Sequence, residues 1–196
     1  MCVMILAHHI ILTGYGHWLP NDPRGSLSTD FRNPSLAPLG DIHHGRKPHQ
    51  PSSAEIRTFY TDAKPKLQYP TLWFDPRQRL AIGEAIADVV RKNRLTCYAC
   101  AVLSDHVHVV IRRHRLKAQE MIPLLMKTTR DRLLTSKLVP PAHPVWSCDP
   151  YVKYKNNVHE IRTAIEYVER NLVKHRTGEQ KWEFVVTYDG WPHQRA

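Results

Sequence analysis

The sequence predicts an α+β fold in which one antiparallel sheet packs against helices. Short β-branched or apolar runs typical of strands are separated by longer segments whose apolar residues recur every three or four positions, which is typical of helices. The turn at Ser104-Asp105 joins two of these runs directly, and so short a connection allows only antiparallel pairing. We expect one domain over residues 1–196, because single domains usually contain about 100–200 residues.

The first strand is expected at residues 8–13, where a β-branched run ends at a Gly14-Tyr15-Gly16 turn. The next residues, about 17–70, are rich in Pro, Gly, Ser and His and show little periodicity. A long segment of this composition is expected to be an insertion and not a packed layer. It would separate the first strand from the rest of the domain.

A helix is expected from Asp75 to about Asn93. Asp75 is a capping residue, the proline after it suits the first helical position, and Gln78 completes a capping box. The apolar run at 95–103 then predicts a strand that is buried on both sides. A third strand, at 106–112, would form a tight hairpin with it.

The second half of the chain supplies a helix at about 118–134 and a strand at 145–155. The resulting order β-α-β-β-α-β is that of the ferredoxin-like arrangement, an antiparallel sheet with helices on one face. A C-terminal helix at about 158–175 and a strand-like tail at 182–187 are expected to follow it.

Two histidines of the third predicted strand share one face. Side chains alternate along a strand, so Val107 and Val109 point one way while His106 and His108 point the other. Neighbouring imidazoles on the open face of a sheet have a suitable separation to hold one divalent cation. The alternative is a pair of partly exposed histidines with no ligand.

The predicted C-terminal helix carries a tyrosine away from its apolar stripe. At about 100° per residue, Tyr167 lies roughly 140° from the middle of that stripe, on the polar side of the helix. Asn171 follows one turn later, so an amide oxygen and a phenol can reach the same place. Tyr151 and Tyr154 lie in the fourth predicted strand.

The composition favours a polyanionic partner, with nucleic acid as the first candidate. Lys and Arg number 28 against 18 Asp and Glu, which gives a formal charge of +10. Single-stranded nucleic acid is bound by basic residues interleaved with aromatic ones. The residues considered for DNA contact are Trp18, Arg24, Arg112, Arg113, Lys127, Arg130, Lys153, Lys155 and Arg170.

The cysteines and the apolar runs exclude other classes of protein. Cys2, Cys97, Cys100 and Cys148 show no disulfide spacing, and positions 97 and 100 would face opposite ways in a strand, which disfavours a zinc or redox pair. No apolar run is long enough to span a bilayer. The first six residues lack the charged start of a signal peptide, so we expect a cytoplasmic protein.

Two short stretches resemble a known family. The strand LSDHVHVVI and the later helix AIEYVERNLVK are similar to those of the HUH single-tyrosine transposases, and in particular of the IS200-like, REP-associated tyrosine transposases. The helix matches at Tyr167, Asn171 and Lys174, with Leu172 in place of the family's usual proline. Trp146 and the run from Gly14 to Gly25 also resemble family segments, whereas residues 32–70 are unmatched.

The resemblance implies a mechanism. His106 and His108 would hold Mg²⁺ or Mn²⁺, with Asn171 as the third ligand. Tyr167 would be the nucleophile, with Tyr151 and Tyr154 as the alternatives. Attack on single-stranded or hairpin DNA would leave a 5′-phosphotyrosine link and a free 3′-hydroxyl, so that another 3′-hydroxyl can reverse the step. A phenol has a pKa of about 10, so the metal or a cation such as Lys174 would assist the loss of its proton.

Other readings remain open. A non-catalytic relative of this family would bind hairpin nucleic acid without forming a covalent adduct. A small metal-dependent hydrolase could use Asp105 with the two histidines, but an aspartate beside a histidine in a strand would face the opposite side, which argues against it. The sequence does not decide between a monomer and a homodimer.

Overall fold

The protein contains one four-stranded antiparallel sheet. The computed structural model describes residues 4–147 and 150–192. The strands, in the spatial order β2-β3-β1-β4, are β1 (Ala7–Thr13), β2 (Cys97–Val102), β3 (His106–Arg112) and β4 (Tyr151–Lys155). Each neighbouring pair is antiparallel, with β1 and β3 in the centre. This order, with a helix in each crossover, confirms the predicted ferredoxin-like arrangement.

Two helices cover one face of the sheet. Helix α2 (Pro76–Asn93) connects β1 to β2, and helix α3 (Ala118–Thr135) connects β3 to β4. The capping box forms as predicted: the Asp75 carboxylate accepts from the Gln78 amide, and the Gln78 side chain accepts from the Asp75 amide, each at 2.8 Å. Apolar side chains of both helices pack with the inward residues of the strands in the larger core cluster.

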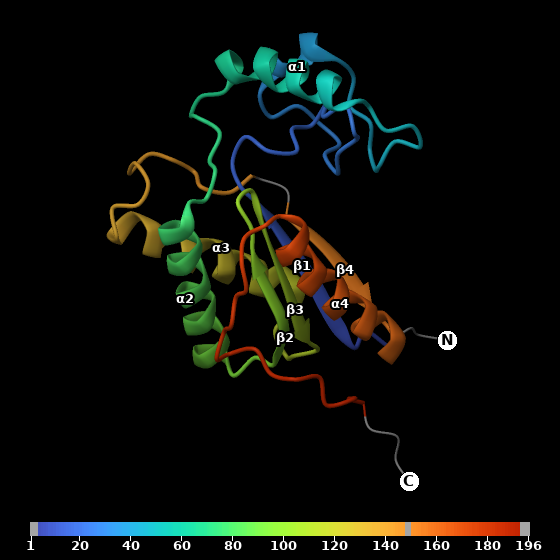
Figure 1. Ribbon diagram of the computed structural model, residues 1–196, viewed down its shortest axis with the longest axis vertical. Coiled ribbons are helices and arrows are strands. Elements are labelled where there is room, and N and C mark those ends of the chain that lie inside the picture. Colours follow the sequence, from blue (N-terminus) through green and yellow to red (C-terminus); the bar gives the residue numbers. More distant parts are fainter. Residues whose placement is uncertain (1–3, 148–149, 193–196) are drawn as a thin grey trace.

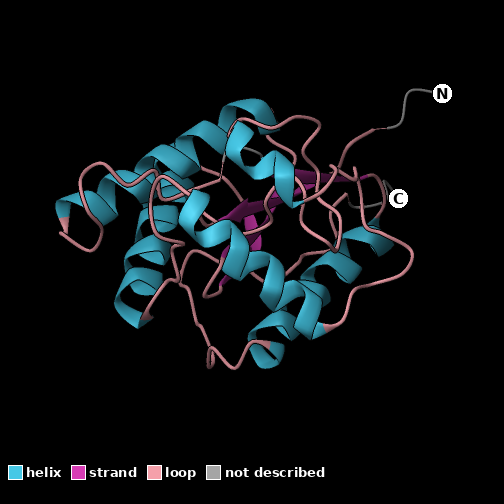
Figure 2. Cartoon of the chain, turned by 90° about the horizontal axis from the view of Figure 1, so that it is seen from above, coloured by secondary structure: helices cyan, strands magenta, loops and turns pink. Residues whose placement is uncertain are grey.

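Helix α4 (Val158–Lys174) covers the opposite face (Figure 1). Its Asn157 side chain caps the first turn by accepting from the Glu160 amide at 2.8 Å. Ile161, Ala164 and Val168 pack against a second apolar cluster on this face of the sheet. The strands therefore lie between two helical layers, as Figure 2 shows from above.

The insertion is more ordered than the sequence suggested. It contains helix α1 (Ser53–Ala63) and two short 3₁₀ segments, η1 (Pro34–Leu39) and η2 (Lys64–Lys66). The prediction that this region is not a packed layer was wrong, because Leu19, Leu36, Phe59 and Ala63 form a small core of their own. Single apolar residues spaced far apart along the chain meet here, so no periodicity marks them. This unit sits above the end of the sheet (Figure 1).

The prediction that Cys97 and Cys100 face opposite ways was also wrong. A register shift between Cys97 and Ala99 inserts an extra residue, so Cys97 and Cys100 both face the larger core instead of opposite sides. Both thiols are free and buried, and burial raises the pKa of Cys97 to about 12. Neither is suited to redox or metal chemistry there. Cys2 and Cys148 lie outside the described residues.

The C-terminal tail follows the outer edge of β2. The Gln180 side chain accepts from the Val102 amide at 2.9 Å and donates to the Val102 carbonyl at 2.7 Å. Farther on, Val186 N–H donates to the Cys97 carbonyl, and Val185 makes an isolated parallel bridge with Cys97 where the sequence predicted a strand-like segment. In the described part of the chain, no helix is long and apolar enough to cross a membrane.

The fourth strand is shorter than predicted, beginning at Tyr151 and not at residue 145. Trp146 instead makes an isolated bridge with Gly14, and its indole N–H donates to Thr129 Oγ1 at 3.0 Å. This anchors the end of β1 to α3.

Candidate active site

His106 and His108 lie side by side on the sheet face that α4 covers. Val107 and Val109, which alternate with them, belong to the core on the other face. The two Nε2 atoms are 2.9 Å apart, and the rings are nearly perpendicular at a centroid distance of 4.6 Å. His108 is 2% exposed, whereas His106 lies nearer to solvent.

Asp105 orients His106. Its carboxylate lies 2.7 Å from His106 Nδ1, so it accepts a hydrogen bond from Nδ1–H and leaves Nε2 directed at His108. Burial alone would raise the pKa of the Asp105 carboxyl, but the hydrogen bond and the charge of His106 lower it overall. The expectation that Asp105 faces away from the histidines was wrong, because Asp105 belongs to the turn before β3 and does not follow strand alternation.

His9 holds His108 in a similar way and was not identified from the sequence. It lies on β1 opposite Val110 of β3, and its Nε2 is 3.0 Å from His108 Nδ1. The His8-His9 pair in a predicted strand was a usable signal, because one of two consecutive strand residues must face the same side as His108.

These buried histidines are neutral at neutral pH. Burial, then the positive charges of Lys155 and Lys153, lowers the pKa of His9 to about 4. Burial, then the neighbouring His106 and His9, lowers the pKa of His108 to about 2. Neutral imidazole is the form that binds metal ions.

The pair of Nε2 atoms fits a shared metal ion. Two nitrogens bound to one ion at about 2.1 Å and at right angles would be about 3 Å apart, close to the observed 2.9 Å. Each ring is also fixed from behind, by Asp105 and by His9, as is usual for metal-binding histidines. Among the described residues, no group of three His, Cys, Asp or Glu side chains is placed to hold a metal ion.

Tyr167 contacts this cluster from α4. Its ring centroid is 5.5 Å from that of His108 and 5.9 Å from that of His9, and 48% of the residue is exposed. The buried residues of α4, Ile161, Ala164, Val168 and Asn171, place Tyr167 about 80° from the middle of the buried face and not 140°. Tyr167 therefore lies at the edge of the packed face, where it borders both the histidines and solvent.

Asn171 is buried at 5% exposure, which corrects its predicted place on the polar side of the helix. Helix α4 packs on a sheet face rich in polar groups, so the buried stripe includes a polar residue that apolar periodicity excludes. Its amide nitrogen donates to the Tyr167 carbonyl at 2.7 Å, which leaves the amide oxygen as the group suited to a metal ion.

The two alternative tyrosines lie farther from the histidines. Tyr154 pairs with His8 on the opposite face of the sheet, and its hydroxyl accepts from Gln119 of α3 at 3.3 Å. Tyr151 is on the correct face, but β1 separates it from β3, which corresponds to two strand spacings or about 10 Å. Of these three tyrosines, Tyr167 is therefore the one whose ring contacts His9 and His108.

His175 extends the cluster beyond the end of α4, and the sequence did not mark it. Its ring centroid is 5.4 Å from that of His106. Lys174 is exposed and two helical turns beyond Tyr167, about 10 Å along the axis. No hydrogen bond or ion pair links these two side chains within the described residues, and the positive charge of Lys174 instead contributes to lowering the pKa of His175.

Lys153 and Lys155 are the basic residues best placed beside the site. They pair with His9 and Ala7 of β1, so both lie on the sheet face that carries the histidines. Arg170 is exposed on α4, where its guanidinium donates to the Glu166 carbonyl at 3.3 Å.

Several other basic residues predicted to contact DNA make contacts within the protein. Lys127 and Arg130 belong to α3, on the far side of the sheet, and Lys127 forms an ion pair with Asp131. Arg112 lies 3.7 Å from Asp189 and stacks on Trp191, while Arg113 donates its backbone N–H to Leu6. Arg112 lies on the histidine face of β3 but at the opposite end of the strand from His106, where it pairs with Ala7.

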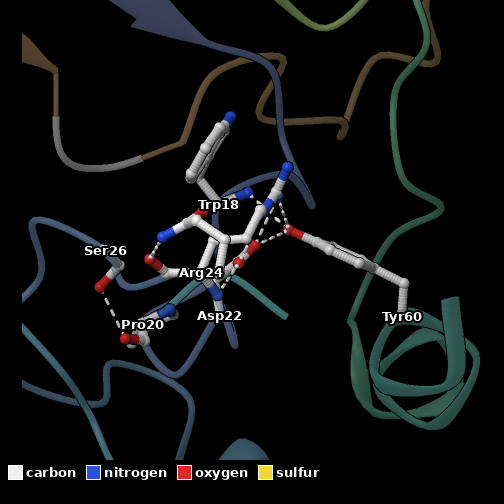
Figure 3. A network of polar contacts seen from close by, with 7 residues as sticks. Trp18, Pro20, Asp22, Arg24, Ser26 and Tyr60 are labelled. Atoms are coloured by element: carbon white, nitrogen blue, oxygen red, sulfur yellow. Dashed lines mark hydrogen bonds and ion pairs between the residues drawn. The ribbon is translucent and has the colours of Figure 1, made fainter. Parts of the chain in front are cut away.

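Arg24 is fixed within the insertion (Figure 3). Its guanidinium donates to both carboxylate oxygens of Asp22, at 2.8 and 2.6 Å, and the Tyr60 hydroxyl donates to the same carboxylate. The guanidinium carbon also lies 3.8 Å from the centre of the Trp18 ring. Asp22 offsets the charge of Arg24, while Trp18 stays 42% exposed.

Two solved structures are similar to this chain. A REP-associated tyrosine transposase bound to a REP hairpin matches over 89% of this chain and 72% of its own, with 11% identity and a TM-score of 0.45. A transposase candidate from Deinococcus radiodurans R1 matches over 86% of this chain and 92% of its own, with 16% identity and a TM-score of 0.40. The first is of the family that the sequence resembles. No family model matches the chain, and no curated protein does.

Proposed function

We propose that this protein is a transposase-type enzyme that cleaves and rejoins single-stranded DNA through a covalent link to Tyr167. The observation that supports this most strongly is the position of Tyr167, a half-exposed phenol in contact with two buried, neutral histidines. Following the sequence resemblance, we propose single-stranded DNA next to a hairpin as the substrate.

The chain's own residues can hold a divalent ion, for which we propose Mg²⁺ or Mn²⁺. His106 and His108 would bind it through Nε2, and the amide oxygen of Asn171 is the proposed third ligand. Such an ion, when bound, supplies a Lewis acid for the oxygens of a phosphodiester. Asp105 and His9 hold the two proposed ligands in place. The Asp105 carboxylate accepts from His106 Nδ1, and His9 Nε2 is hydrogen-bonded to His108 Nδ1, so the Nε2 atom of each ligand keeps its orientation.

The transfer step balances without an outside energy source. The bond from the Tyr167 oxygen to phosphorus forms as the bond from phosphorus to the 3′ oxygen breaks, which leaves a free 3′-hydroxyl. The phenol loses its proton in this step, and its 48% exposure gives that proton access to solvent. Attack by another 3′-hydroxyl restores the tyrosine and joins the strands. Lys153 and Lys155 can attract the phosphate backbone to this face.

The test is covalent capture of DNA. A single-stranded oligonucleotide with a hairpin, labelled at its 3′ end, is incubated with the protein and Mn²⁺ and then resolved on a denaturing gel. We expect a labelled protein band that EDTA prevents and that Tyr167→Phe abolishes. Tyr154→Phe, which removes a hydroxyl on the opposite face of the sheet, is the matched control and should leave the band unchanged.

Three results would each contradict part of the proposal. An adduct that persists in Tyr167→Phe would assign the nucleophile elsewhere. Binding of the oligonucleotide by the parent protein with no adduct under any metal condition would instead indicate a non-catalytic DNA-binding protein. If His106→Ala and His108→Ala still form the adduct at the parental rate with Mn²⁺, the two-histidine metal site is wrong.

A further inference from the structure

An extended segment at residues 70–74 crosses the end of the sheet beside the candidate active site. The Leu72 amide donates to the Tyr15 carbonyl at 3.0 Å, and the Phe74 amide donates to the Ser104 carbonyl at 2.6 Å. Ser104 directly precedes Asp105, whose carboxylate holds His106. The backbone of this segment is therefore fixed within a few residues of the two-histidine site.

Trp73 points outward from this fixed backbone. Its neighbour Phe74 is 1% exposed and belongs to the larger core, and Leu72 packs against that core. Trp73 itself is 62% exposed. An indole can bury roughly 150–250 Å² of surface, so leaving one exposed forgoes a large stabilisation unless a ligand covers it. A fixed backbone also means that little conformational freedom is lost when the ring is covered.

A buried histidine supports this indole from the protein side. The His17 ring meets Trp73 at a centroid distance of 4.4 Å and an angle of 84°, and it is itself held by the Leu72 carbonyl at 2.9 Å. His17 is only 6% exposed. It thus packs against Trp73 without competing for the solvent-facing surface of the indole.

A second exposed indole comes from the residue after His17. Trp18 is fixed by its backbone N–H, which donates to the Tyr60 hydroxyl at 2.9 Å, and it carries the Arg24 guanidinium on its ring (Figure 3). Both indoles therefore lie next to the buried His17: Trp18 is its neighbour in sequence, and Trp73 contacts its ring. Trp18 lies at the start of the insertion and Trp73 lies three residues after its end.

We propose that Trp73 and Trp18 form a stacking surface for unpaired bases of single-stranded DNA, next to the phosphate that Tyr167 attacks. This inference rests on the proposed function for the identity of the ligand. Every nucleobase has an aromatic face, and exposed aromatics combined with basic groups are the usual means of binding single strands without sequence preference. The formal charge of +10 attracts the phosphates, and Lys153 and Lys155 lie on the face of the cluster. The surface would then hold bases while the cluster holds the phosphate.

The experiment measures equilibrium binding of a mixed-sequence single-stranded oligonucleotide in EDTA, where no cleavage takes place. We expect Trp73→Ala to weaken binding about 5- to 100-fold, the range that removal of a stacking aromatic produces. Trp73→Phe, which keeps an aromatic face, should restore most of the affinity. Tyr154→Ala is the matched control, because it removes an exposed aromatic ring from the opposite face of the sheet and should change binding less than twofold.

An oligonucleotide made only of abasic sites separates stacking from charge. The parent and Trp73→Ala should bind it with equal affinity, since it has a backbone but no bases. Equal binding of the normal oligonucleotide by parent and Trp73→Ala would overturn the inference, as would failure of the parent to bind it. A change in sedimentation of the DNA-free protein on Trp73→Ala, without a change in DNA affinity, would assign the indole to contacts between copies instead. The covalent adduct on Tyr167 is a separate readout, so the stacking surface and the proposed function can fail independently.

Discussion

Replacement of Asp105 by asparagine tests whether the histidine pair is a metal site. The substitution keeps the size of the side chain but replaces the charged carboxylate, which accepts a hydrogen bond from His106 Nδ1 at 2.7 Å, with a neutral amide. The side chains of Asp105 and His106 are 19% and 13% exposed, so water replaces this bond only in part. A hydrogen bond to a charged group contributes about 1.5–3 kcal/mol, and loss of a carboxylate behind a metal-binding histidine typically weakens metal binding about 10- to 100-fold. The two ranges agree, since a tenfold change is about 1.4 kcal/mol.

The assay is a titration of the protein with Mn²⁺, in which electron paramagnetic resonance reports the free ion. We expect Asp105→Asn to shift the Mn²⁺ dissociation constant upward by one to two orders of magnitude. The control is Asp131→Asn, which removes an aspartate whose partner, Lys127, lies on α3 across the sheet. If Asp105→Asn binds Mn²⁺ as tightly as the parent does, Asp105 does not orient a ligand and the metal site is refuted as described.

Two further predictions concern stability. Folding lowers the pKa of His9 to about 4 and that of His108 to about 2. Below about pH 6.5 the unfolded chain therefore binds more protons than the folded one, and the free energy of unfolding falls as the pH is lowered toward 4. Urea unfolding should show a smaller free energy of unfolding at pH 5 than at pH 7. His9→Gln should reduce this difference by about 1–2 kcal/mol. An equal difference in the variant would contradict the burial of a neutral His9. Gly83→Ala places a methyl group against the ring of Trp182, so the tail should be displaced despite a gain in helix propensity. Hydrogen exchange at the Val102 amide should then become faster, and unchanged protection would show that the tail tolerates the substitution.

The sheet and its helices followed from local patterns. The capping box at Asp75, the apolar run before Ser104 and the short turn after it each act within a few residues, and the structure has the predicted elements in the predicted order. Patterns of period two also placed His106 and His108 on one face, because the alternating Val107 and Val109 belong to the core.

What the sequence did not predict depends on contacts between distant residues. His9 approaches His108 only because β1 and β3 are paired in a particular register, which periodicity alone does not specify. Asn171 is buried because α4 packs on a sheet face that contains polar groups. The spacing of apolar residues therefore predicted the wrong side of the helix for Asn171. The small core of the insertion likewise joins residues 19 and 63, which no local pattern connects.

The bonds of Gln180 to both backbone groups of Val102 have a consequence for assembly. An exposed strand edge invites another chain to continue the sheet, and here a side-chain amide already occupies the position that such a strand would take. Two copies could not merge their sheets through β2 unless the tail were first released. The remaining edge, at β4, carries Lys153 and Lys155, and like charges would face each other if two copies joined there. Both borders of the sheet thus discourage self-pairing, and the basic side chains of β4 beside the histidines stay available to a partner of opposite charge.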